Sequence, residues 1–82
     1  MEKTEVQTKV KKVVSKVLKM DPSEIRDDAN FVFDLGADSM QSIEMMAGFE
    51  EEFNIEMDQN KALEVQTIDG AVDFISSQLI NA

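Results

Sequence analysis

The chain has 82 residues and contains no His, Cys, Trp or Tyr, and its 17 Asp and Glu against 8 Lys and Arg give a net charge of −9. Without His or Cys there is no Ser-His or Cys-His nucleophile pair, no thiol redox centre, no disulfide and no zinc site of the usual kind. We therefore expect no catalytic residue and no metal site, and the length predicts one domain over residues 1–82.

The charge is distributed unevenly along the chain. Residues 1–20 carry a net charge of +4, whereas residues 21–82 carry two basic and fifteen acidic residues, a net charge of −13. Such a field repels nucleic acid and attracts basic protein surfaces, although a merely solubilising surface is the simpler explanation of the acidity taken alone. From the charge we expect no binding to nucleic acid. No apolar run is long enough to span a membrane, so we expect a cytoplasmic protein.

The first predicted helix lies between Glu5 and Leu18. Its apolar residues recur at the spacing of one helix face, namely Val6, Val10, Val13, Val14, Val17 and Leu18. After it, Asp21 is a capping residue, Pro22 suits a first helical position, and Glu24 follows in the first turn. These three residues predict a short helical turn.

A long loop is predicted from Arg26 to Ala37, where no hydrophobic period persists. The loop is not polar, because it contains Phe31, Val32, Phe33 and Leu35. A loop of this length in so small a domain is usually functional.

The clearest predicted helix covers residues 38–53. Asp38 can cap its start, with Gln41 in the position that completes a capping box. The four-residue spacing of Met45, Phe49 and Phe53 predicts that these side chains lie in the core, whereas the acids of this helix, Glu44 and residues 50–52, are predicted to face solvent.

Two further helical segments follow. Residues 58–64 predict a short helix, and Thr67 can cap a last helix whose apolar residues are Ile68, Ala71, Val72, Ile75, Leu79 and Ile80. The expected fold is all-α, a small four-helix bundle of three longer helices and one short helix, with a long loop between the first and second main helices.

The segment from Asp34 to Met40 places a serine, Ser39, in the first turn of a helix after a glycine-containing loop. The free N–H groups and the dipole of a helix start can stabilise a phosphodiester on that hydroxyl, although ordinary capping also explains the Asp-Ser pair. Because the chain has no base with a suitable pKa, a reaction at Ser39 must be catalysed by another protein. The sequence therefore favours a substrate or carrier over an enzyme.

At these residues the sequence resembles a known family. The run Asn30-Phe-Val-Phe-Asp-Leu-Gly-Ala-Asp-Ser-Met40, followed by Glu44 and by Phe49-Glu-Glu-Glu-Phe53, resembles acyl carrier proteins of the bacterial fatty-acid type, and the resemblance extends from the first helix to Ile75. It implies that a phosphopantetheinyl transferase attaches 4′-phosphopantetheine from coenzyme A to Ser39. The thiol of that arm would then carry acyl groups as thioesters in fatty-acid or related lipid or polyketide synthesis.

The resemblance also implies how the carrier meets its partners and its cargo. We expect a monomer whose second helix docks on basic patches of the transferase and of acyl-transferring, condensing and reducing enzymes. The docking residues carried over are Asp38, Met40, Ile43, Glu44, Ala47, Glu50 and Glu51. The residues expected to line an acyl pocket, each of which is explained equally well by core packing, are Met45, Met46, Phe49, Met57, Ala62, Leu63, Ile68 and Ala71.

Five positions depart from the family pattern. Met40 stands where Leu is usual, Gln41 where an acid is common, Phe33 where a polar residue is usual, and Asp58 where Pro is frequent. Gly48, inside the second helix, costs about 1 kcal/mol relative to Ala. These departures predict a specialised member of the family with its own partner or cargo. The alternative function is an unmodified acidic adaptor that binds a basic partner through the second helix.

Overall fold

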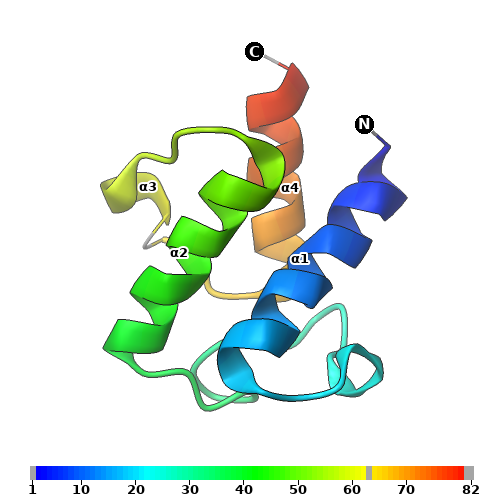
Figure 1. The fold of residues 1–82 in the computed structure, drawn as a ribbon, viewed down its shortest axis with the longest axis vertical. Coiled ribbons are helices and arrows are strands. Elements are labelled where there is room, and N and C mark those ends of the chain that lie inside the picture. Colours follow the sequence, from blue (N-terminus) through cyan, green and yellow to red (C-terminus); the bar gives the residue numbers. More distant parts are fainter. Residues whose placement is uncertain (1, 63, 81–82) are drawn as a thin grey trace.

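Four α-helices form the fold in the computed structural model, which describes residues 2–62 and 64–80. They are α1 (Lys3–Leu18), α2 (Ser39–Phe53), the short α3 (Gln59–Ala62) and α4 (Ile68–Ile80), and a single 3₁₀ turn, η1 (Pro22–Glu24), follows α1 (Figure 1). The expected all-α architecture, with a short third helix and a long loop before α2, is confirmed. In the described ranges, extended pairing is limited to one isolated bridge between Asn30 and Thr67.

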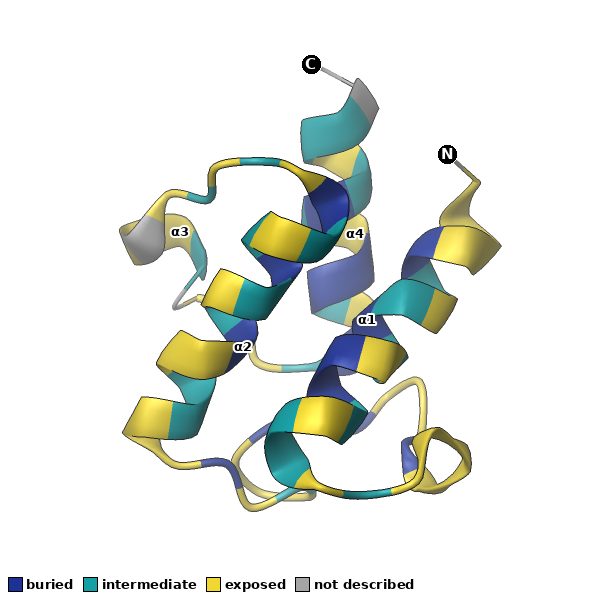
Figure 2. Cartoon of the chain, in the orientation of Figure 1, coloured by how far each residue is buried: buried dark blue, intermediate teal, exposed yellow. Residues whose placement is uncertain are grey.

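Helix α1 is the element that holds the bundle together. Val6, Val10, Val13 and Val14 of its apolar stripe are buried, whereas Val17 and Leu18 at the end of the stripe are half-buried. The helix packs against both α2 and α4 (Figure 2). Two ion pairs support these contacts: the Lys3 ammonium lies 2.6 Å from the Asp73 carboxylate on α4, and that of Lys12 lies 3.2 Å from Glu52 on α2. Lysines of α1 thus form ion pairs with acids of the other two long helices.

The loop between η1 and α2 is fixed to the start of α4 by backbone hydrogen bonds. Phe31 N donates to the Gln66 carbonyl at 2.9 Å, and Ile68 N donates to the Ala29 carbonyl at 3.0 Å. Ile25, Ala29 and Phe31 are also buried in the core. The loop is therefore an ordered part of the fold, and it determines where α2 begins.

An ion pair ties the same loop to α1. The Lys11 ammonium donates to the Asp27 carboxylate, and this hydrogen bond, with a second from Gln7, holds the pKa of Asp27 below its ordinary value. A hydrogen bond to the ionised form lowers a carboxyl pKa because it stabilises that form.

Helix α2 has the predicted start. Gln41 N donates to the Asp38 carboxylate at 2.8 Å, and Asp38 N donates to the Gln41 side-chain oxygen at 3.1 Å, so both hydrogen bonds of a capping box are present. At the other end, Asn54 adopts the left-handed conformation, with φ of 54°. The predicted core residues of the helix, Met45, Phe49 and Phe53, are buried.

The prediction that all four acids of α2 face solvent is wrong for two of them. Glu44 and Glu51 are exposed, but Glu50 and Glu52 are half-buried. The Glu50 carboxylate accepts a hydrogen bond from Met57 N at 3.1 Å, and Glu52 pairs with Lys12. Both carboxylates have a partner inside the molecule, which the helical spacing alone does not reveal.

Gly48 is required by the close approach of α1 and α2. A Cβ added to this residue would lie 2.7 Å from Val13 Cγ1, which is inside van der Waals contact. The sequence indicates Gly48 only as a weak point of the helix, whereas in the structure it makes room for the neighbouring helix.

None of the helices within residues 2–62 and 64–80 combines the length and the apolar content that a membrane crossing requires.

Candidate functional site

Ser39 is the first residue of α2, and its side chain is exposed. The neighbouring Asp38 is engaged with the helix: its carboxylate accepts from Gln41 N, and its carbonyl accepts from the Ser42 hydroxyl at 3.0 Å. Asp38 therefore stabilises the start of α2, and the Ser42 hydroxyl, one turn further on, is engaged in a hydrogen bond. The Ser39 hydroxyl is the one presented to solvent at this helix start.

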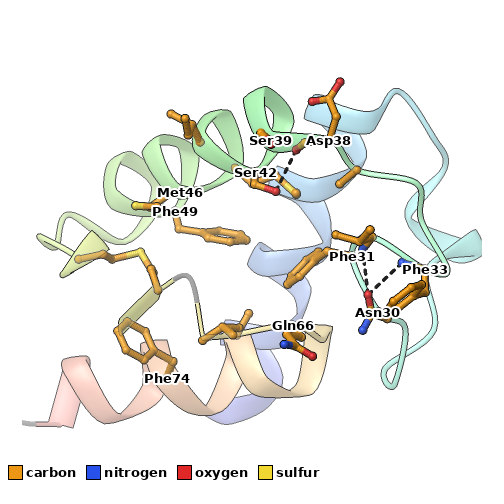
Figure 3. A pocket seen from close by; sticks show the side chains of 18 residues that line it. Asn30, Phe31, Phe33, Asp38, Ser39, Ser42, Met46, Phe49, Gln66 and Phe74 are labelled. Atoms are coloured by element: carbon orange, nitrogen blue, oxygen red, sulfur yellow. Dashed lines mark hydrogen bonds between the residues drawn. The ribbon is translucent and has the colours of Figure 1, made fainter. Parts of the chain in front are cut away.

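A cavity of about 750 Å³ lies beside Ser39, between α2 and α4 (Figure 3). Asp38 and Ser39 stand at one end of it, and Phe74 of α4 stands at the other. Because α1 packs against both long helices, the face that α2 turns towards α4 is left to line this space. The cavity is thus a product of the packing of the bundle.

Most of the expected pocket residues lie along this cavity. Those that line it are Met45, Met46, Phe49, Met57, Ala62 and Ala71. Ile68 is fully buried in the core and is not among the lining residues, whereas Leu63 lies outside the described residues.

The sequence reasoning did not identify several lining residues, among them Phe31, Val65, Gln66 and Phe74. A signal for Phe74 was present, because it lies three residues after Ala71 and so shares a face of α4 with it. Phe31 reaches the cavity from the loop, where no periodicity indicates direction.

The expected docking residues form the outer side of α2. Asp38, Met40, Ile43, Glu44, Ala47 and Glu51 are exposed, and only Glu50 is half-buried. Met40 and Ile43 are 70% and 55% exposed, which is unusual for large apolar side chains on a folded domain. Negative and apolar groups are therefore available together beside Ser39.

The site shows the features that a covalently attached phosphate-linked arm needs. The hydroxyl that would receive the arm is exposed at a helix start, where the first N–H groups have no partner within the helix. Gly36, with φ of 72°, has no atom within 4 Å of the place a side chain would occupy, so the approach beside the loop is open. In the described part of the chain, no three His, Cys, Asp or Glu side chains gather to hold a metal ion.

Comparison with known proteins gives the family. Residues 8–75 match the family described as "Phosphopantetheine attachment site". An acyl carrier protein of Guillardia theta is 40% identical over 79 residues, which are 96% of this chain and 98% of that protein. The chain belongs to the acyl carrier proteins. The resemblance inferred from the run that ends at Met40 is thereby confirmed.

Two further relatives show the range of this similarity. The acyl carrier protein of Phenylobacterium zucineum is 41% identical over 76 residues, covering 93% of this chain and 96% of that protein. "Acyl carrier protein 2, mitochondrial" of Arabidopsis thaliana is 47% identical over 77 residues, and there the match spans 94% of this chain but 61% of the relative. Proteins of this family carry 4′-phosphopantetheine covalently and are carriers rather than enzymes.

Proposed function

We propose that this carrier holds acyl intermediates as thioesters on a 4′-phosphopantetheine arm attached to Ser39, in fatty-acid or related lipid synthesis. The observation that carries the proposal is the position of Ser39, which is exposed at the capped start of α2 and also lines the apolar cavity. The arm supplies the thiol that the chain itself lacks. One serine thus has access both to enzymes in solution and to an apolar space within the bundle.

Attachment of the arm requires an external enzyme. The Ser39 oxygen forms a bond to the pantetheine phosphorus of coenzyme A, the bond from that phosphorus to the bridging oxygen breaks, and the adenosine bisphosphate half leaves. The hydroxyl proton must pass to a base of the transferase, because the chain has no His and the Asp38 carboxylate is bound to Gln41 N. The first N–H groups of α2 then favour the negative charge of the phosphodiester.

The exposed side of α2 supports a docking role. Glu44 and Glu51, with Asp38, present carboxylates to solvent, and Met40 and Ile43 lie among them. A basic enzyme surface would be attracted by the charges and would bury the apolar side chains on contact. We assign this surface to the transferase and to the acyl-transferring, condensing and reducing enzymes of lipid synthesis. The half-burial of Glu50 makes it a weaker candidate than Glu44 and Glu51.

The cavity supports a second part of the proposal, that an acyl chain folds back between α2 and α4. Its walls are mainly apolar, and Met45, Met46 and Met57 supply flexible side chains that adapt to different shapes. Burial of an acyl chain there would remove its apolar surface from water. Each buried CH₂ group would contribute about 0.8 kcal/mol of favourable free energy.

The attachment site can be tested with a broad-specificity phosphopantetheinyl transferase and coenzyme A. We expect the intact mass of the wild-type chain to increase by one phosphopantetheine, and the Ser39→Ala variant to remain unmodified. Ser42→Ala is the matched control, since it removes a neighbouring hydroxyl that already donates to the Asp38 carbonyl. A mass gain in Ser39→Ala, or none in the wild type, would contradict the proposal. An unmodified acidic adaptor would retain its function in Ser39→Ala.

A further inference from the structure

Four large apolar side chains are strongly exposed among the described residues, and all of them lie within twelve residues of sequence around Ser39. Met40 and Ile43 belong to the docking side of α2 described above. Val32 and Phe33 do not, because they lie in the loop before the helix. Phe33 is 86% exposed and Val32 is 56% exposed, and exposed apolar groups gathered in one place commonly indicate an interaction site.

The loop presents Phe33 in a fixed position. The Asn30 side-chain oxygen accepts from Val32 N at 2.9 Å and from Phe33 N at 3.0 Å. The Asp34 carboxylate in turn accepts from Asn30 N at 2.7 Å, and Ala37 N donates to the Phe31 carbonyl at 2.8 Å. The backbone on both sides of Phe33 is thus hydrogen-bonded, so the loop has little backbone conformational entropy left to lose on binding.

The surroundings of Phe33 indicate the chemistry of its partner. Exposed acids, Asp34, Asp38 and Glu44, flank the apolar group, and residues 21–82 carry a net charge of −13. That field repels a second copy of this chain and an anionic membrane surface. The complementary surface is therefore an apolar pocket bordered by Lys and Arg.

Among the enzymes that meet the carrier, the transferase is the one that must reach the Ser39 oxygen itself, whereas the others act at the far end of the arm. Its surface has to cover the immediate neighbourhood of Ser39. Phe33 and Val32 line the same cavity as Ser39, and Phe33 lies on the side of it away from Phe74 (Figure 3), so a surface that covers Ser39 is placed to meet them.

We propose that Phe33, assisted by Val32, is an apolar anchor by which the phosphopantetheinyl transferase of this carrier's own source recognises it, in addition to contacts with α2. The proposal rests on the proposed function, because it assumes that Ser39 receives the arm. It makes the loop before α2 a selectivity element: a transferase with an apolar pocket at this point modifies the carrier faster than one without it.

The test compares Phe33→Ser with Phe33→Leu, using the transferase from the chain's own source and coenzyme A. Truncation of a central aromatic anchor typically reduces binding at least tenfold, so we expect kcat/KM for Phe33→Ser to fall roughly tenfold, mainly through KM. Phe33→Leu keeps an apolar side chain and should stay within about twofold of the wild type. Because the anchor is apolar, the loss should persist at about 0.5 M salt, where charge contacts are screened. Both variants should unfold at the wild-type temperature, since the ring is exposed.

Several results would overturn this proposal. Equal kcat/KM for Phe33→Ser and the wild type would show that the transferase does not bind the ring. A loss that disappears at high salt, or one that Phe33→Leu shares, would show that an apolar contact is not responsible. A concentration-dependent dimer in sedimentation that Phe33→Ser abolishes would assign the ring to self-association instead. Failure of the proposed function is distinguishable, because the wild type would then gain no mass at all.

Discussion

At the scale of single residues, Asp38 and Ser39 have separate roles at the start of α2. Asp38 satisfies the N–H of Gln41, and this fixes the first turn of the helix. Ser39 makes no contribution to the cap and remains exposed. Stability and modification at this site are therefore separable by substitution.

We predict that Asp38→Ala lowers the stability of the chain by about 1 kcal/mol, the usual cost of removing a capping side chain. In a domain of this size, that change lowers the melting temperature by roughly 4 to 8 °C. Asp38→Asn is the control, because an amide oxygen caps as well as a carboxylate. An equal loss in both variants, measured by thermal unfolding, would assign the effect to charge and not to the capping hydrogen bond.

The cap was predictable from the sequence because it depends on a local spacing, that of Asp38 and Gln41. The exposure of Phe33 was not, since a loop has no period from which to infer direction. The half-burial of Glu50 was not predictable either, because its hydrogen-bond partner, Met57 N–H, lies seven residues away and is brought near only by the fold.

At the scale of helices, the contact between α1 and α2 depends on Gly48. The space that a side chain would need is occupied by Val13 Cγ1 at 2.7 Å. Val13 is β-branched and has little rotamer freedom in a helix, so it cannot easily move aside. The close approach of these helices leaves the opposite face of α2 to line the cavity with α4.

We predict that Gly48→Ala destabilises the chain by about 1 kcal/mol, because overpacking exceeds the gain in helix propensity. In a Val13→Ala background the same substitution should instead stabilise, since the clash is removed. Chemical unfolding of the wild type, the two single variants and the double variant gives the interaction free energy between positions 13 and 48. Ala47→Gly, at an exposed neighbouring position, should cost about 1 kcal/mol and serves as the propensity control. A stabilising Gly48→Ala in the wild-type background would refute the account of this contact.

The helical pattern predicted the core of α4 better than its cavity face. Ile68 and Ile75, two of the apolar residues whose spacing predicted this helix, are fully buried, although the family resemblance placed Ile68 in the acyl pocket. The division of α4 between core and cavity depends on the direction of the neighbouring helices, which determines that Ala71 and Phe74 line the space while Ile68 does not.

At the scale of the whole molecule, the separation of charge along the sequence becomes a set of contacts in space. Lysines of α1 form ion pairs with Asp73 on α4, Asp27 in the loop before α2 and Glu52 on α2. Other acids, including Glu51 and Glu56, are exposed and form no ion pair within the described ranges. With a net charge of −9, repulsion among these acids opposes folding.

We predict that raising the salt concentration from about 20 mM to about 300 mM increases the melting temperature by roughly 2 to 5 °C, because screening relieves this repulsion. The double variant Glu51→Gln, Glu56→Gln should melt higher than the wild type at low salt and gain less from added salt. Scanning calorimetry of both proteins measures the effect. A melting temperature that falls with salt would mean that the α1 ion pairs outweigh the repulsion.

The intact mass of the protein purified from its native cells, with fragmentation to locate the modification, shows whether Ser39 carries acyl groups on a phosphopantetheine arm. We predict one phosphopantetheine on Ser39, part of it bearing acyl groups that hydroxylamine releases. An unmodified chain, or a modification placed on another residue such as Ser42, would contradict it.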